Sequence, residues 1–337
     1  MRITLPVALL TGCVLVLVGC QGTGRQADVK LDSAALAMFA PLPDVMASPD
    51  NPITEAKVEL GRALYFEKRL SRDNSVSCND CHHLDRYGAD TGNVSVGVGG
   101  ALGGRNSPTV YNAAGHIAQF WDGRAPNVEQ QAKGPILNPV EMAMPGDPAV
   151  MKALAADAKY RAMFKAAFPD AASPMTYDNL GKAIGAFERK LVTPSRWDRF
   201  LKGEDSVLTN EEKAGFNTFV TVGCATCHNG PYVGGTMYQK AGVVNPWPDT
   251  SDVGREAVTR QPADRMVFKV PSLRNIERTG PYFHNGKVVS LDSALTTMAH
   301  AQLGKQLTPQ QIQQITAWLN TLTGDIPATY VTPPVGG

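Results

Sequence analysis

The chain has 337 residues, and its 32 basic and 31 acidic side chains leave a formal net charge of +1. This balance gives no electrostatic footprint for nucleic acid, so we expect no nucleic-acid partner. The length is sufficient for two domains of ordinary size. Charged residues make up only 19% of the chain, whereas 32 glycines and 24 prolines indicate long loops.

The N-terminus has the features of an export signal. Arg2 precedes an apolar run over residues 5–18 that is too short for a membrane span. The run ends in Leu17-Val18-Gly19-Cys20, which resembles the lipobox of bacterial lipoproteins. We therefore expect residues 1–20 to be a signal peptide and Cys20 to carry a lipid. Cys13 fits the pattern less well, and an ordinary signal peptide with an incidental cysteine is the alternative.

The next part of the chain alternates between loops and helices. Residues 21–46 read as a tether that ends in a proline-rich turn. Apolar residues at helical spacing predict a helix over 54–70, and amphipathic helices over 149–168 and 177–192. The glycine-rich stretch 87–112 cannot build a helix and predicts an ordered loop.

A second unit begins at Thr209, which with Glu212 forms a capping box. Its helix is expected to extend to about Val222. Thr308 and Pro309 begin the last helix, whose apolar residues lie on one face. No segment shows convincing strand alternation, so the sequence predicts an all-α fold.

Two pentapeptides carry the chemistry of the chain. Residues 78–82 read Cys-Asn-Asp-Cys-His, and residues 224–228 read Cys-Ala-Thr-Cys-His. C-x-x-C-H is the attachment signature of c-type haem, in which both thiols bind the porphyrin and the histidine binds the iron. A redox dithiol or half of a zinc site is the alternative, and His83 could favour zinc. Zinc needs two more soft ligands near each pair, and the remaining cysteines, Cys13 and Cys20, lie in the export signal.

A helix leads into each of these motifs, which indicates a duplicated module. We therefore predict two cytochrome c-like domains with long ordered loops and one covalent haem c each. The expected division of the chain is a signal peptide over 1–20, a tether over 21–46, an N-terminal haem domain over 47–192, a C-terminal haem domain over 193–325 and a tail over 326–337.

Several ungapped stretches carry a family resemblance. They are Arg105–Thr109, Gln119–Arg124, Glu129–Pro135, Asn138–Met142, Gly280–Gly286, and Met298 with Gln302–Gly304. With these stretches the chain resembles the bacterial di-haem cytochrome c peroxidases over nearly all of the mature protein. The resemblance implies reduction of hydrogen peroxide to water with electrons from a small redox protein, such as cytochrome c or a cupredoxin.

The resemblance implies that the N-terminal haem, held by Cys78, Cys81 and His82, is the peroxidatic one. The glutamate and glutamine on its distal side match Glu141 and Gln131. Splitting peroxide heterolytically moves a proton from one oxygen to the other, which a positioned carboxylate can do for a gain of ~10²–10⁴-fold. Without the surrounding stretch, Glu141 would be interpreted as an ordinary loop residue.

The C-terminal haem, held by Cys224, Cys227 and His228, is expected to store an electron. The family's second axial ligand there is a methionine that matches Met298, and His/Met ligation raises the iron's potential. The alternative for Met298 is a structural role, because most methionines in helical proteins fill the core. Met237 and Met266 are the rival candidates for the ligand. Trp121 matches the family's tryptophan between the haems, although a plain buried aromatic is compatible with its position.

The resemblance also implies a calcium ion at the domain interface. Its ligands match the Asn106 side chain and the backbone carbonyls of Thr279 and Pro281. Calcium takes six to eight oxygen ligands, so waters would complete the set.

One residue departs from the family pattern. Many members carry a histidine in the glycine-rich loop that ligates the peroxidatic iron in the fully oxidised enzyme, and Val98 stands at that position. Valine cannot bind iron. Either the oxidised site is open, or another group closes it, with His83 and His116 as the first candidates.

Two other functions remain open at this stage. A related enzyme class uses the same haem pair to oxidise residues of a partner protein in tryptophylquinone biogenesis, but its best-known member replaces the methionine ligand with tyrosine. A non-enzymatic di-haem electron carrier would not need Glu141 or an open iron. We expect a periplasmic protein, lipid-anchored to the outer membrane, and a homodimer by analogy with family members.

Overall fold

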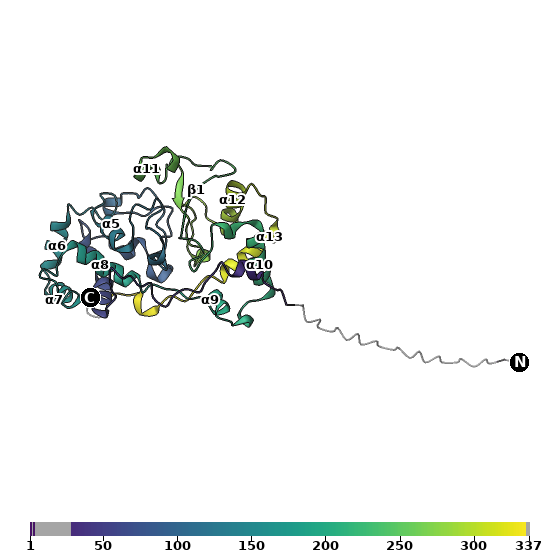
Figure 1. Ribbon diagram of the computed structural model, residues 1–337, viewed down its shortest axis with the longest axis horizontal. Helices are drawn as coiled ribbons and strands as arrows, with labels where there is room; N and C mark the ends of the chain where they lie inside the picture. Colours follow the sequence, from purple (N-terminus) through teal and green to yellow (C-terminus); the bar gives the residue numbers. More distant parts are fainter. Residues whose placement is uncertain (2, 4–27, 335–337) are drawn as a thin grey trace.

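The structure is a computed structural model that describes residues 1, 3 and 28–334. The predictions on Cys13 and Cys20 therefore fall outside the described residues. The described part is mostly helical, as expected, and forms two halves that lie side by side (Figure 1). None of its helices is long and apolar enough to cross a membrane.

The N-terminal half is built on a crossed helix pair. Helix α2 (Glu55–Tyr65) begins after Thr54, whose side chain accepts a backbone hydrogen bond. It packs against α8 (Tyr177–Glu188) with Gly61 at the crossing, where a Cβ atom would collide with the carbonyl oxygen of Ala183. The core around this crossing is apolar and fully buried, with Leu60, Leu64, Phe164, Leu180 and Ile184 among its members.

The C-terminal half repeats this arrangement. Helix α10 (Asn210–Val222) packs against α13 (Pro309–Asn320), and a Cβ atom on Gly215 would collide with the carbonyl oxygen of Gln314. Helix α10 begins with the capping box expected from the sequence, and α13 begins after Thr308 as expected, with a capping box of its own. A helix pair with glycine at its crossing thus occurs in each half, and α2 and α10 each precede a C-x-x-C-H motif.

The other α-helices connect and cover these pairs. They are α1 (Ser33–Leu36), α3 (Cys78–Cys81), α4 (Val128–Gln131), α5 (Lys133–Leu137), α6 (Asp147–Ala155), α7 (Ala158–Ala167), α9 (Arg196–Leu201), α11 (Glu256–Thr259) and α12 (Leu291–Leu303). The single helix expected over 149–168 is two helices, α6 and α7. The break lies at Asp157, whose side chain accepts a hydrogen bond from the backbone N–H of Lys159 and so begins a new helix.

Two short strands were not expected. Strand β1 (Tyr238–Lys240) pairs antiparallel with β2 (Val267–Lys269), and Tyr238 lies opposite Lys269. Strands of three residues are too short for an alternating pattern to appear in the sequence.

Each end of the described chain packs on the opposite half. Residues 28–46, part of the expected tether, lie against the C-terminal half, where the ring of Phe39 contacts that of Trp197 at 5.9 Å. The chain is therefore packed rather than free over these residues. At the other end, the ring of Tyr330 contacts that of Phe187 in the N-terminal half at 5.5 Å.

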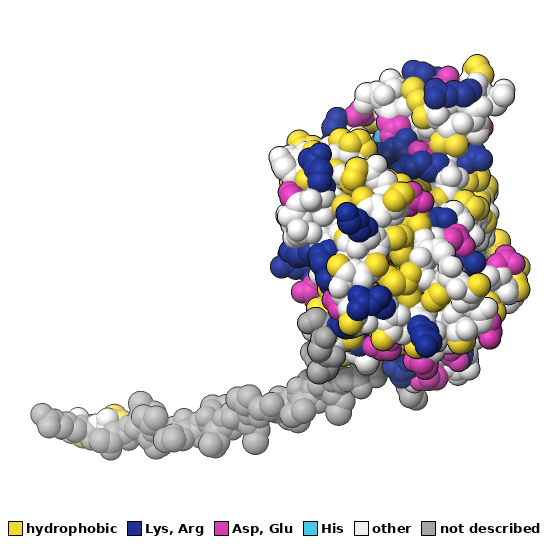
Figure 2. Space-filling model, turned by 90° about the vertical axis from the view of Figure 1, so that its left-hand side faces the viewer, with side chains coloured by type: hydrophobic (Ala, Val, Ile, Leu, Met, Phe, Trp, Pro, Cys, Tyr) yellow, Lys and Arg dark blue, Asp and Glu magenta, His cyan; other side chains and the backbone are white. Residues whose placement is uncertain are grey.

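The surface mixes charged and apolar side chains. On the face in Figure 2, basic and acidic side chains are interspersed, with apolar side chains between them. This face therefore presents no single sign of charge.

Candidate functional site

The first C-x-x-C-H motif opens into a cavity of about 760 Å³ in the N-terminal half. Cys78 and Cys81, on α3, and His82 all line it. The Nδ1 atom of His82 lies 3.0 Å from the carbonyl oxygen of Pro108. A hydrogen bond from Nδ1–H to a carbonyl fixes the ring and leaves Nε2 as the metal-binding nitrogen.

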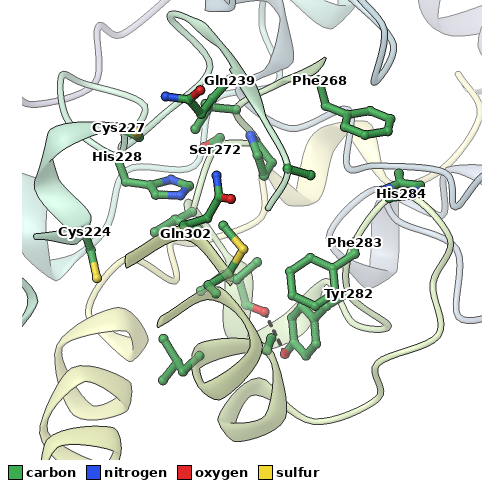
Figure 3. Close-up of a pocket in the computed structure, with 18 of the residues that line it drawn as sticks. Cys224, Cys227, His228, Gln239, Phe268, Ser272, Tyr282, Phe283, His284 and Gln302 are labelled. Atoms are coloured by element: carbon green, nitrogen blue, oxygen red, sulfur yellow. Dashed lines mark hydrogen bonds between the residues drawn. The ribbon is translucent and has the colours of Figure 1, made fainter. Parts of the chain in front are cut away.

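The second motif opens into a cavity of about 230 Å³ in the C-terminal half. Figure 3 shows Cys224, Cys227 and His228 on one side of this cavity. His228 Nδ1 lies 3.4 Å from the carbonyl oxygen of Val233, a longer contact than that of His82. Burial lowers the pKa of His228 to about 4, so the ring is neutral, which is the form that binds a metal.

The donor sets fit haem better than the two alternatives. Among the described residues, no group of three or more His, Cys, Asp or Glu side chains could hold a metal ion, which argues against zinc at either motif. A redox dithiol needs an accessible thiolate, whereas burial raises the pKa of both Cys81 and Cys224 to about 11. Haem attachment requires only two thiols and one histidine beside a cavity, and each motif provides them.

Glu141 and Gln131 line the same cavity as the first motif. Gln131 ends α4, and Glu141 follows α5, where its Oε1 atom accepts a hydrogen bond of 2.8 Å from the Asn138 amide. Burial raises the pKa of Glu141, although the charge of Arg124 and the Asn138 hydrogen bond oppose the shift. The structure therefore brings a carboxyl group and a carboxamide to the cavity, and the carboxyl holds a proton more readily than an exposed one.

Val98 does not reach this cavity. It is 4% exposed and packs in an apolar cluster that includes Ile136 and Met142. Its backbone N–H donates a 2.8 Å hydrogen bond to the carbonyl oxygen of Glu141. His83 and His116 are also absent from the cavity lining. None of the groups considered for closing the site reaches it in this structure.

Trp121 lies between the two cavities and lines both of them. Its indole N–H donates a 2.9 Å hydrogen bond to the carbonyl oxygen of Asn106. Its own carbonyl oxygen accepts a 2.8 Å hydrogen bond from the backbone N–H of Lys269. The tryptophan is thus fixed by both halves.

Met298, on α12, lines the C-terminal cavity together with His228. Its rivals Met237 and Met266 do not line that cavity, and Met266 is buried in the adjoining apolar cluster. Position therefore favours Met298 over the other two methionines as a ligand.

The three expected calcium ligands lie around one cavity. Asn106, Thr279 and Pro281 all line the C-terminal cavity, and Asn106 lines the N-terminal cavity as well. Asn106 is 6% exposed, and its amide nitrogen donates a 3.2 Å hydrogen bond to the carbonyl oxygen of Gly92. Calcium binding itself stays a prediction.

Some residues of the site were missed by the sequence analysis. Arg105 bridges the halves, with Nη1 2.6 Å from Asp122 and Nε 2.7 Å from Asp252. Glu188 lines the N-terminal cavity, and burial raises its pKa to about 8. Arg105 and Asp122 stand in matched stretches, but nothing in the sequence pairs Arg105 with Asp252, which is 147 residues away.

Two C-x-x-C-H motifs, each beside its own cavity in a mostly helical fold, define the class of multi-haem c-type proteins. Residues 55–206 match the model of the di-haem cytochrome c peroxidase family. Over 309 residues the chain is 45% identical to cytochrome c551 peroxidase of Pseudomonas aeruginosa, covering 90% of this chain and 88% of that protein. The chain therefore belongs to the di-haem cytochrome c peroxidase family, which implies two haem c groups.

Two further comparisons are with a MauG protein and a MauG-like protein. The chain is 35% identical to methylamine utilization protein MauG of Methylorubrum extorquens over 309 residues, 88% of this chain and 86% of that protein. A solved structure of a MauG-like protein associated with microbial copper homeostasis has a TM-score of 0.78 and 27% identity, covering 87% of this chain and 97% of that chain. Both similarities are consistent with the same fold.

Proposed function

We propose that the protein is a cytochrome c peroxidase that reduces hydrogen peroxide to water with electrons from a small redox protein, a cytochrome c or a cupredoxin. The observation that carries this proposal is the presence of Glu141 and Gln131 in the cavity lined by Cys78, Cys81 and His82. The 45% identity with a cytochrome c551 peroxidase supports the same function.

The cofactors follow from the two motifs. Cys78, Cys81 and His82 would hold one haem c in the N-terminal domain, residues 47–192, and His82 would be the iron ligand. Cys224, Cys227, His228 and Met298 would hold the other in the C-terminal domain, residues 193–325. When bound, the haem irons supply peroxide binding and electron transfer.

The protein's own contribution at the peroxide site is proton transfer. Glu141 in its ionised form accepts a proton from peroxide and returns it to the departing oxygen. Asn138 holds the carboxylate by one oxygen, which leaves the other for peroxide. The charge of Arg124 favours the ionised form, and Gln131 supplies a carboxamide that can hydrogen-bond the substrate.

The remaining assignments are part of the same proposal. Trp121 carries electrons between the two haems, because its side chain borders both cavities. Calcium, bound through Asn106, Thr279 and Pro281, stabilises the border between the halves. The protein is periplasmic, anchored to the outer membrane by a lipid on Cys20, and forms a homodimer.

Partner oxidation is the second candidate function. It is favoured by the relationship to MauG, but the identity is 35% against 45% for the peroxidase. Met298 in the C-terminal cavity also argues for the peroxidase, since the best-known partner-oxidising enzyme carries tyrosine as this ligand. A simple electron carrier would leave Glu141 without a role.

One experiment separates the three functions. The purified holo-protein is mixed with hydrogen peroxide and reduced cytochrome c, and the oxidation of cytochrome c is followed. A peroxidase gives continuous turnover that depends on both substrates. A long-lived oxidised haem pair without turnover would indicate partner oxidation, and slow oxidation independent of peroxide would indicate an electron carrier. Either of these results would overturn the proposal.

A further inference from the structure

Lys269 is a buried cation in the wall of the C-terminal cavity. It ends β2, lines the cavity and is 8% exposed. Among the described residues that line this cavity, it is the only lysine or arginine. No carboxylate in the described part of the chain forms an ion pair with it, and burial lowers its pKa to about 8.

The partner that the protein provides for Lys269 is a neutral one. Its Nζ atom lies 3.1 Å from Nδ1 of His116. Burial and the nearby Lys269 charge lower the pKa of His116 well below its ordinary value, so the imidazole is neutral. Since an ammonium can only donate, Nδ1 accepts and the ring proton lies on Nε2. That Nε2 atom is itself buried without a hydrogen-bond partner.

The pair therefore combines a positive charge with an unused N–H donor and contains no anion. Other buried cations of this molecule differ, because Arg189 is paired with Glu129 and Arg274 with Asp198. A buried charge is costly unless it is paired and hydrogen-bonded. The site at Lys269 is thus incomplete in a specific chemical sense, since it lacks an anionic acceptor.

We infer that Lys269 binds a carboxylate of the haem in the C-terminal cavity, with His116 holding the ammonium in position. This inference rests on the proposed function, which places a haem there. Haem c carries two propionate carboxylates, and these supply the anionic class of ligand that a buried ammonium requires. The N-terminal cavity provides arginines instead, and its Arg105 and Arg124 are already paired with carboxylates.

A fixed positive charge beside this haem has a measurable consequence. Reduction adds one negative charge to the haem, and a nearby cation stabilises the product in a medium of low dielectric constant. Lys269 therefore raises the reduction potential of the C-terminal haem, as the Met298 ligand does through the iron. The electron-storing role of this haem needs a high potential.

The test is a spectroscopically monitored redox titration of the holo-protein and its variants at pH 7. We expect Lys269→Met to make reduction of the C-terminal haem at least tenfold less favourable, which is about 59 mV for one electron, and to leave the N-terminal haem unchanged. Lys269→Arg should keep most of the wild-type potential. Lys240→Met is the matched control, because Lys240 is an exposed lysine on the paired strand β1 and its charge is screened by solvent.

The titration distinguishes the inference from the function on which it rests. A wild-type spectrum with fewer than two haems per chain would contradict the proposed function. If the protein holds two haems but Lys269→Met leaves the potential of the C-terminal haem unshifted, the role of Lys269 is overturned and the proposed function is not. An equal shift of that potential in Lys240→Met would also overturn the role of Lys269. If Lys269→Met does not fold, the neutral but polar Lys269→Gln variant is titrated in its place, with the same expected direction.

Discussion

Glu141 is held from two sides at the N-terminal cavity. Its carboxylate accepts from Asn138, and its carbonyl oxygen accepts from the N–H of Val98. The backbone contact fixes where the residue lies, while the amide contact fixes how the carboxylate is turned. Proton transfer depends on such positioning, because the acid–base group must stay within hydrogen-bond reach of the substrate.

Glu141→Gln tests the acid–base role. We expect the kcat/KM for peroxide to fall by about 10²–10⁴-fold, because an amide cannot exchange the proton. Since burial raises the pKa of Glu141 and the ionised form is active, wild-type kcat/KM should fall as pH drops through this raised pKa, above the range of an ordinary glutamate. The variant should lack this acid limb. Glu204→Gln, at an exposed carboxylate, serves as the control, and an acid limb that persists in Glu141→Gln would contradict the assignment.

Met298→His tests the axial ligand of the C-terminal haem. Replacing a thioether with imidazole should lower the potential of that haem well below the wild-type value, because His/Met ligation is the high-potential arrangement. The spectrum of the N-terminal haem should not change. Met266→Leu is the control, and an unchanged potential in Met298→His would transfer the ligand role to Met237 or Met266.

The residues predicted from the sequence are those that stand in short, local patterns. The cysteines and histidines proposed to hold the haems follow from a pentapeptide, and the proposed roles of Glu141 and Gln131 follow from the family resemblance of the stretches around them. Lys269 could not be found in this way, because its significance depends on burial and on His116, 153 residues away. Such pairings are properties of the fold and leave no local signal.

The loop over residues 95–103 borders the N-terminal cavity through Ser95 and Gly103. Val98 anchors it in the apolar cluster, and Gly97 packs directly against the backbone of Val140 and Glu141. Gly99 and Gly100 have positive φ and open space around them. The loop is therefore held against the core at Gly97 and Val98, and its own backbone hydrogen bonds, such as that from Gly103 N–H to the carbonyl oxygen of Ser95, hold it together.

Val98→His tests whether this anchor keeps the iron site open. The wild-type protein should react with peroxide when fully oxidised, because valine offers no ligand. A histidine is poorly accommodated in the apolar cluster, which favours release of the loop and places an imidazole near the iron. The variant should show low-spin iron and a lag that half-reduction removes, in stopped-flow measurements. Val98→Ala should show no lag, and a wild type that needs prior reduction would contradict the account.

Elements with strong local signals were predicted well. The capping box at Thr209 begins α10, and Thr308 with Pro309 begins α13, both as expected. The break between α6 and α7 was missed, because the apolar pattern continues across Asp157 and only its cap reveals the interruption. The strands β1 and β2 were missed because their pairing joins segments far apart in the chain.

At the scale of the whole molecule, a buried carboxylate holds the N-terminal segment on the C-terminal half. Asp198 is 1% exposed and accepts hydrogen bonds from Arg274 at 2.7 and 2.9 Å. It also accepts from the backbone N–H of Leu42, at 2.7 Å, in the segment expected to be a tether. One carboxylate thus fixes the N-terminal segment and the loop that carries Arg274.

Asp198→Asn should therefore destabilise the protein. Removing one charge of a buried pair leaves the guanidinium of Arg274 unpaired, at a cost of about 3–5 kcal/mol in the free energy of unfolding. Urea unfolding of the holo-protein measures the change, with Asp205→Asn as the exposed control. A loss below about 1 kcal/mol would show that the pair is replaced by other contacts.

We expect one chain to hold two electrons, one on each haem, and to deliver both to a single peroxide molecule. The most direct measurement is an anaerobic titration of the fully reduced holo-protein with hydrogen peroxide, followed by its absorption spectrum. Because peroxide takes two electrons and two protons to form two waters, one equivalent per chain should return both haems to the oxidised state. Reoxidation of only one haem, or a requirement for two equivalents, would contradict the claim.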